Sequence, residues 1–267
     1  MEKFIRVQNL DITYTETNSN KQNTLLFVHG NSGSKNVYHH QLACELFKDY
    51  RVIAMDLPGH GQSSRCEDED CYTITWYSKI VKSFISTLNL TSVILVGHSL
   101  GGHVVVGASD KSYTKGLVIF HTPPLNRTYD AAYGFNQSPH FACYLNGEVS
   151  PENVDLLLDA TLYNKNAYEQ FLLNDFMNTH PSCRTKLGTS AQANVQLNEI
   201  DKLRKATFPI AIFTTDHDPI VNVKYIKELN FRLWSGDLVC INESGHYPQL
   251  ENPEAFNREL LNFLKTL

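Results

Sequence analysis

The segment SVILVGHSLG, residues 92–101, joins a short apolar run to a G-x-S-x-G motif. Residues 93–96 are all aliphatic, which is typical of a buried strand, and the pattern of residues 104–108 indicates a helix. A serine on a sharp turn between a strand and a helix has a strained backbone and an exposed hydroxyl. This context predicts that Ser99 is a nucleophile.

The two glycines of the motif have a steric role. Gly97 and Gly101 stand two residues either side of the serine, and only residues without a side chain let the neighbouring chain pass that close. The helix that follows directs its first N–H groups at the serine, where they favour developing negative charge. The backbone N–H of Leu100 is therefore the first predicted donor of an oxyanion hole.

Segments on both sides of the motif repeat the alternation of strand and helix. Short apolar runs alternate with amphipathic stretches, a pattern that predicts a mostly parallel sheet covered by helices on both faces. We expect a doubly wound α/β fold with eight strands. The predicted strands are residues 4–7, 12–15, 25–28, 51–55, 92–96, 117–120, 209–213 and 237–241, and the clearest predicted helices are 36–47, 74–88 and 253–264.

The alternation stops after residues 122–124 and returns only at residue 209. The intervening stretch has helical spacing and is punctuated by Pro139, Pro151 and Pro181. The sequence therefore predicts a core of residues 1–124 and 206–267, with a helical cap inserted at residues 125–205.

A nucleophilic serine needs a base and an orienting carboxylate. Of the eleven histidines, His246 follows the last predicted strand, at the edge where α/β sites form. Asp216 and Asp218 both follow the preceding strand. We favour Asp218, because Asp-Pro-Ile-Val leads into a helix, and we interpret Asp216 as a turn residue. The chain order Ser, Asp, His differs from that of the two main serine protease classes.

The second oxyanion donor should come from the loop after residues 25–28. We assign it to the backbone N–H of Asn31, whose side-chain amide is a further candidate donor. His29 and His60 are interpreted as bracing their loops through hydrogen bonds. His103 is expected to pack beneath the helix that follows the serine.

Composition and charge exclude several classes of protein. The net charge is -5 and no basic run is interleaved with aromatic residues, so nucleic acid is not an expected partner. No stretch approaches the roughly 20 apolar residues that span a bilayer, and residues 1–8 lack a secretory signal. We expect a cytoplasmic protein with no membrane partner. The histidines and cysteines show no zinc-ligand spacing, so we expect no metal and no cofactor.

The six cysteines leave two readings open for one pair. Cys66 and Cys71 flank the acidic run at residues 67–70 and could form a disulfide if oxidised. In a reducing cytosol free thiols are the favoured state.

Four segments together resemble the α/β-hydrolase superfamily along nearly the whole chain. They are HGN at 29–31, DLPGHG at 56–61, GHSLGG at 97–102 and SGH at 244–246. The resemblance implies the α/β-hydrolase fold. Ser99 distinguishes the chain from haloalkane dehalogenases and epoxide hydrolases, which have aspartate there.

Within the capped hydrolases, the chain is similar to the N-acyl homoserine lactonases of α/β-hydrolase type. HGNS at 29–32, GHSLGGH at 97–103, TPP at 122–124 and the cap segment 134–152 carry this likeness. It implies opening of the lactone ring of a bacterial quorum signal, that is, quorum quenching. His98 stands where the lactonase has tryptophan. Leu157 falls near its substrate-contacting cap tyrosine, for which Tyr133 and Tyr144 are candidate substitutes.

The predicted function is hydrolysis of a carboxylic ester or lactone through an acyl-enzyme on Ser99. The catalytic core alone leaves a short-chain carboxylesterase, a thioesterase and a C–C bond hydrolase open, because function depends on the details of the site. A small-molecule receptor on a hydrolase fold is the alternative from another class. Fast turnover would exclude the receptor.

Overall fold

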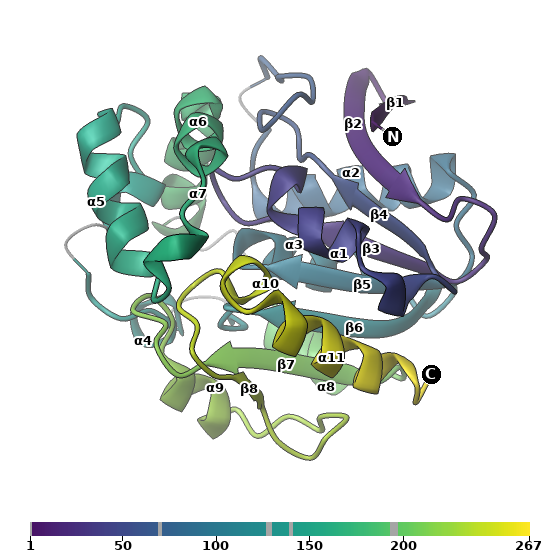
Figure 1. Ribbon diagram of the computed structural model, residues 1–267. Helices are drawn as coiled ribbons and strands as arrows, with labels where there is room; N and C mark the ends of the chain where they lie inside the picture. Colours follow the sequence, from purple (N-terminus) through teal and green to yellow (C-terminus); the bar gives the residue numbers. More distant parts are fainter. Residues whose placement is uncertain (1, 69–70, 127–129, 139–140, 193–196) are drawn as a thin grey trace.

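One eight-stranded sheet runs through the molecule in the order β1-β2-β4-β3-β5-β6-β7-β8 (Figure 1). This computed structural model describes residues 2–68, 71–126, 130–138, 141–192 and 197–267. The β1–β2 and β2–β4 pairs are antiparallel and the other pairs are parallel, so the predicted fold class is confirmed. The strands are β1 (Glu2–Val7), β2 (Leu10–Thr17), β3 (Thr24–Val28), β4 (Arg51–Met55), β5 (Val93–His98), β6 (Thr114–Phe120), β7 (Ile210–Thr215) and β8 (Val239–Ile241).

The parallel strands end in register, and this alignment places the site. Val28 at the end of β3 pairs with Gly97 of β5, and His98 pairs with Phe120 at the end of β6. Every residue of β3, β5 and β7 is buried, as expected for strands covered on both faces. The loops after β3, β5, β6 and β7 therefore meet at one edge of the sheet.

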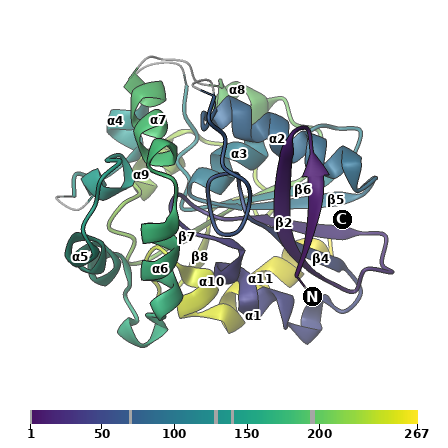
Figure 2. The ribbon, with the colours of Figure 1, turned by 90° about the horizontal axis from the view of Figure 1, so that it is seen from above.

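Helices cover both faces of the sheet (Figures 1 and 2). On one face lie α2 (Ile74–Thr87), α3 (Leu100–Ala108) and α8 (Glu199–Arg204), and on the other lie α1 (His39–Leu42), α10 (Pro248–Glu251) and α11 (Pro253–Leu264). Helix α11 has the bounds that the apolar spacing predicts. Helix α2 begins at Thr73, whose side chain caps it by accepting a hydrogen bond from the Trp76 N–H.

All the elements described between β6 and β7 are helical. They are α4 (Asp130–Gly134), η3 (Phe141–Tyr144), α5 (Pro151–Thr161), η4 (Lys165–Ala167), α6 (Gln170–Asn178), α7 (Pro181–Gln192) and α8. Figure 1 shows α5, α6 and α7 beside the carboxyl ends of the parallel strands. Helix α8 packs instead against α3 on the core. Beyond β7, α9 (Val223–Glu228) contacts α4. Pro139, part of the predicted helical insert, lies outside the described residues.

The predicted helix at residues 36–47 is wrong as a single element. The segment forms η1 (Lys35–Tyr38), α1 and η2 (Glu45–Phe47) in succession. Long-range contacts override the helical spacing: the Gln41 side chain donates to the Gln249 carbonyl and to Asn257 of α11.

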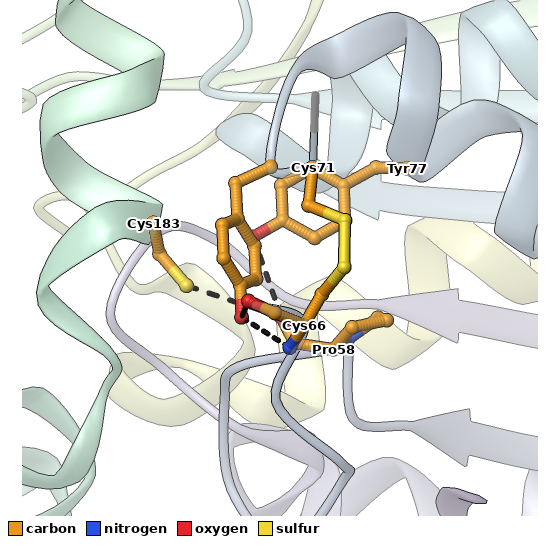
Figure 3. The surroundings of a disulfide bond; sticks show 6 residues. Pro58, Cys66, Cys71, Tyr77 and Cys183 are labelled. Carbon is orange, nitrogen blue, oxygen red and sulfur yellow. Dashed lines mark hydrogen bonds between the residues drawn. A yellow bond between two sulfur atoms is a disulfide. The ribbon is translucent and has the colours of Figure 1, made fainter. Parts of the chain in front are cut away.

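Cys66 and Cys71 form a disulfide, so the expectation of free thiols is wrong for this pair (Figure 3). The Tyr72 hydroxyl binds both the N–H and the carbonyl of Cys66. The Cα atoms of the two cysteines lie 6.3 Å apart. Figure 3 shows Cys183 of α7 beside this loop, with its thiol donating to the Pro58 carbonyl. The other four cysteines are free.

None of the helices in the described part of the chain is long and apolar enough to cross a membrane.

Candidate active site

Ser99 lies on the turn between β5 and α3, with φ 50° and ψ −117°. A Cβ on Gly97 would lie under 3.0 Å from the Gly101 carbonyl, and a Cβ on Gly101 would lie under 3.0 Å from the Val28 carbonyl. Real side chains do not approach that closely. The two glycines therefore allow the strand and the helix to pack tightly enough to present the Ser99 hydroxyl at the sheet edge.

Asn31 and Leu100 line the same cavity as Ser99, and their backbone N–H groups have no hydrogen-bond partner among the described residues. The side chain of Asn31 connects the loop after β3 to η3, because its Nδ2 donates to the Tyr144 carbonyl at 2.7 Å. An amide NH₂ carries a second hydrogen, so the role of this side chain as an oxyanion donor stays a prediction. His29 braces this loop as expected, because its Nε2 accepts from the Leu57 N–H at 3.0 Å.

Asp218 accepts a hydrogen bond from His246 Nδ1 at 3.1 Å, and both side chains are buried. This bond puts the proton on Nδ1 and leaves Nε2 able to accept one. Asp216 points elsewhere, and its carboxylate accepts from the N–H groups of Glu243 and Ser244 at 3.3 and 3.5 Å. Of the two candidate aspartates, only Asp218 contacts His246.

A second imidazole, which the sequence reasoning missed, binds the other oxygen of Asp218. His121 follows β6, is 2 % exposed, has φ 51° and donates from Nδ1 to Asp218 Oδ2. Burial raises the pKa of Asp218, but His246 and His121 outweigh burial and hold that pKa well below its ordinary range. Burial lowers the pKa of His121, so its imidazole is neutral. The position of His121 directly after a parallel strand is the sequence feature that could have identified it.

His98 connects the nucleophile to the base. Its Nε2 donates to the His246 carbonyl at 2.8 Å, and its ring stacks on Phe120. Burial, followed by the nearby His246 and His121, lowers the pKa of His98 well below its ordinary value. A neutral His98 therefore fixes the backbone of the loop that carries His246.

Glu251, which the sequence reasoning missed, holds the same loop from the other side. One carboxylate oxygen accepts the N–H groups of Gly245 and Tyr247 at 3.0 Å each. The other accepts the N–H groups of Tyr163 and Asn164, just beyond α5, at 2.7 and 2.9 Å. A single buried carboxylate thus joins the His246 loop to the inserted helices.

A cavity of about 200 Å³ opens on Ser99 and His246. Its walls are mostly apolar and come from both the sheet edge and the insert: Ile74, Leu100, Leu125, Phe135, Phe141, Leu145, Leu187 and Ile220. Asn31, His103 and Tyr144 supply its other polar groups. The cavity can therefore hold an apolar chain whose polar end reaches Ser99.

Three residues were predicted to contact substrate, and only Tyr144 lines this cavity. Tyr133 is 64 % exposed and lies outside the cavity wall. Leu157 lies on the inward stripe of α5 with Val154 and Leu158, and is buried in packing rather than facing the cavity. Those two predictions are therefore wrong for the described cavity.

His103 also differs from expectation. It was expected to pack beneath α3, but it lines the cavity. Its Nδ1 donates to the Glu199 carboxylate, with both oxygens at 2.9 Å. Glu199 stands at the start of α8, 96 residues away, so sequence proximity could not reveal the pair.

Two groups among the described residues have the donor atoms to hold a metal ion. One is His121, Asp218 and His246, whose atoms are already occupied by the hydrogen bonds above. The other is His39, His40 and Glu169, away from the cavity.

A family model described as alpha/beta hydrolase family matches residues 25–259. A curated relative from Bacillus subtilis, the uncharacterized hydrolase YugF, is 23% identical over 268 residues, covering 97% of this chain and 96% of its own.

Solved structures of other hydrolases are also similar to this chain. The N-acyl homoserine lactonase AidH, in a complex of a mutant with N-hexanoyl homoserine lactone, matches with a TM-score of 0.92 and 28% identity, covering 99% of this chain and 97% of AidH. An aryl esterase candidate from Burkholderia cenocepacia matches with a TM-score of 0.84 at 21% identity, over 100% and 98% of the two chains, and so shares the fold.

Proposed function

The chain belongs to the alpha/beta hydrolase family and is an ester-hydrolysing enzyme, and from that premise we propose that it opens the lactone ring of N-acyl homoserine lactones. The observation that carries the proposal is the apolar cavity that the inserted helices close over Ser99 and His246. The match to AidH over nearly the whole of both chains supports the choice of substrate. Quorum quenching is the biological role that such an activity would serve.

Ser99 is the proposed nucleophile and His246 the proposed base. The Ser99 oxygen attacks the lactone carbonyl while its proton passes to His246 Nε2, and Asp218 stabilises the resulting imidazolium through Nδ1. The N–H groups of Asn31 and Leu100 hold the oxyanion, each such donor being worth about 10²–10³ in turnover. As the intermediate collapses, the ring C–O bond breaks and His246 protonates the departing ring oxygen.

The same residues complete the second half of the reaction. The ring-opened homoserine, which still carries its N-acyl chain, remains attached to Ser99 through the carbon of the former lactone carbonyl. His246 then takes a proton from water, the hydroxide attacks that carbon, and Ser99 leaves with the proton. The product is an N-acyl homoserine, whose carboxyl group ionises and releases one proton per turnover.

The side chains that line the cavity suit different parts of the substrate. Aliphatic and aromatic side chains would hold the acyl chain, while Tyr144 and His103 offer polar atoms for the amide. A volume of about 200 Å³ is below the range of about 300–1,000 Å³ for ligand pockets. We therefore expect short acyl chains to be preferred.

Proton release from purified protein tests the proposal. N-butanoyl, N-hexanoyl and N-dodecanoyl homoserine lactones would be compared with p-nitrophenyl butyrate. The Ser99→Ala variant is the test variant and Ser86→Ala, on the exposed side of α2, is the matched control. We expect rapid acid release from the two short lactones, with Ser86→Ala unaffected and Ser99→Ala slower by at least about 10⁴-fold.

Two results would contradict parts of this proposal. Cleavage of the p-nitrophenyl ester with inert lactones would reject the lactone substrate and leave a carboxylesterase. Full activity of Ser99→Ala would reject the mechanism itself.

A further inference from the structure

Three side chains that meet on the surface away from the cavity have the donor set of a metal site. His39 and His40 begin α1 on the core, and Glu169 directly precedes α6 of the insert. Their ligand atoms all lie within 4.8 Å of one another. We propose that His39, His40 and Glu169 form a binding site for a divalent transition-metal ion, with Zn²⁺ the best fit, that joins the insert to the core.

His39 already has the orientation of a metal ligand. Its Nδ1 donates to the Asn36 carbonyl at 3.0 Å, which fixes the tautomer and leaves the Nε2 lone pair free to bind. That Nε2 faces Glu169 Oε1 at 3.6 Å. A backbone carbonyl on the far nitrogen is the usual second contact of a histidine that binds metal.

Glu169 and His40 complete the set. Glu169 occupies the N-cap position of α6, but its side chain makes no capping hydrogen bond and turns to His39. The His40 ring lies 4.0 Å from the His39 ring, centroid to centroid.

The chemistry of the three donors selects the class of ion. Two imidazoles and one carboxylate suit Zn²⁺, which accepts three protein ligands and a water in a tetrahedral site. At bond lengths of about 2.0–2.1 Å, tetrahedral ligand atoms lie about 3.4 Å apart. The His39–Glu169 separation of 3.6 Å is close to this value, so small rotations of partly exposed side chains would complete the site. Mg²⁺ and Ca²⁺ prefer oxygen ligands and would bind poorly.

An ion here would act on the position of the insert. Glu169 starts α6, and two turns further on Asp175 of the same helix accepts a hydrogen bond from Ser34 in the loop after β3. The metal would add a further attachment of α6 to the core. Binding to the folded state alone would then raise the thermal midpoint of unfolding.

Calorimetric titration of the chelator-treated protein with Zn²⁺ tests the site, with Co²⁺ absorption as a report on the ligands. His40→Ala and Glu169→Gln are the test variants. His217→Ala is the matched control, because His217 also pairs with a carboxylate on the surface, that of Asp216. All three positions are partly exposed, so the variants should fold.

We expect one Zn²⁺ per chain, a tetrahedral Co²⁺ spectrum, and affinity at least about tenfold weaker in both test variants. The thermal midpoint should rise with Zn²⁺ in the wild type and in His217→Ala but not in the test variants. Unchanged Zn²⁺ affinity in His40→Ala and Glu169→Gln would overturn the proposal. The absence of Zn²⁺ binding by the wild type would overturn it equally.

Discussion

The Ser99 turn and the His246 loop face the same cavity, but they are held by different kinds of contact. Ser99 is fixed by its own strand and helix and by the close approach that Gly97 and Gly101 permit. The His246 loop is held instead by hydrogen bonds. Its N–H groups bind Glu251 and the Thr161 carbonyl at the end of α5.

The difference shows how the two halves of the site respond to change. The nucleophile depends on backbone sterics within a few residues, so its geometry should be insensitive to the insert. The base depends on hydrogen bonds from α5 and from the segment after it. Movement of the inserted helices should therefore disturb His246 before it disturbs Ser99.

The largest expected effect comes from filling the space at the Ser99 turn. Helix propensity alone would make Gly101→Ala stabilising by about 1 kcal/mol. The new Cβ would, however, lie under 3.0 Å from the carbonyls of Val28 and His29. We expect the clash to win and the free energy of unfolding to fall by more than about 4 kcal/mol, or folding to fail.

Denaturant unfolding followed by circular dichroism measures this effect. Gly188→Ala in α7 is the control, since its Cβ would make ordinary contacts at 3.5 Å. Equal stability of the two variants would show that the turn is not sterically constrained.

The next effect is at the His246 loop. In Glu251→Gln one oxygen becomes an NH₂ group, which cannot accept the two N–H groups that it faces. We expect stability to fall by about 2–4 kcal/mol and kcat to fall about 10–100-fold, because His246 loses its position. Steady-state kinetics on a short lactone or ester would show the loss mainly in kcat. Glu254→Gln, exposed in the first turn of α11, should change little.

If Glu251→Gln lowered stability but left kcat intact, the loop would be positioned by Thr161 and His98 alone. The contrast between the two regions would then lie in packing and not in catalysis.

The features that could be predicted from the sequence are the ones that local contacts determine, as at the Ser99 turn. The eight strands, the bounds of α11 and the turn at Ser99 depend on local patterns of apolar residues and glycines, and these were readable. The choice of Asp218 over Asp216 as the partner of His246 was also readable, from its place before Pro219. Whether these residues catalyse the reaction stays a prediction.

The long-range hydrogen bonds that support the site could not be predicted from the sequence, for a physical reason. Glu251 and Tyr163 lie 88 residues apart, and Glu199 and His103 lie 96 apart. No periodicity marks such pairs, because only the tertiary fold brings them together. The resemblance to the lactonases likewise failed to show that Leu157 faces the packing inside the insert.

A smaller effect is expected at His121, which shares Asp218 with His246. His121→Ala removes one of the two imidazole donors that hold the Asp218 carboxylate in place. We expect kcat/KM to fall about tenfold, because Asp218 is then positioned less firmly against His246 and a fraction of a charge-assisted bond of about 1.5–3 kcal/mol is lost.

A conservative variant separates positioning from simple packing. His121→Asn keeps an N–H donor and tolerates the positive φ, so it should restore most of kcat/KM. An equal loss of kcat/KM in His121→Ala and His121→Asn would indicate a structural role only.

The last expected effect concerns a further contact between the insert and the loop after β3, the bond from Ser34 to Asp175 of α6. Burial raises the pKa of Asp175 from 3.8 to about 6. The folded protein therefore binds this proton more tightly than the unfolded chain does, and stability falls as pH rises from about 4 to 6.

Asp175→Asn removes that loss while keeping an oxygen for Ser34. The variant should equal the wild type near pH 4 and exceed its stability at pH 8 by at most about 3 kcal/mol. Denaturant unfolding at both pH values measures the difference. A variant less stable than the wild type at pH 8 would mean that the charged carboxylate, through its bond to Ser34, anchors α6 to the core. The insert would then hold the loop after β3 as firmly as it holds the His246 loop.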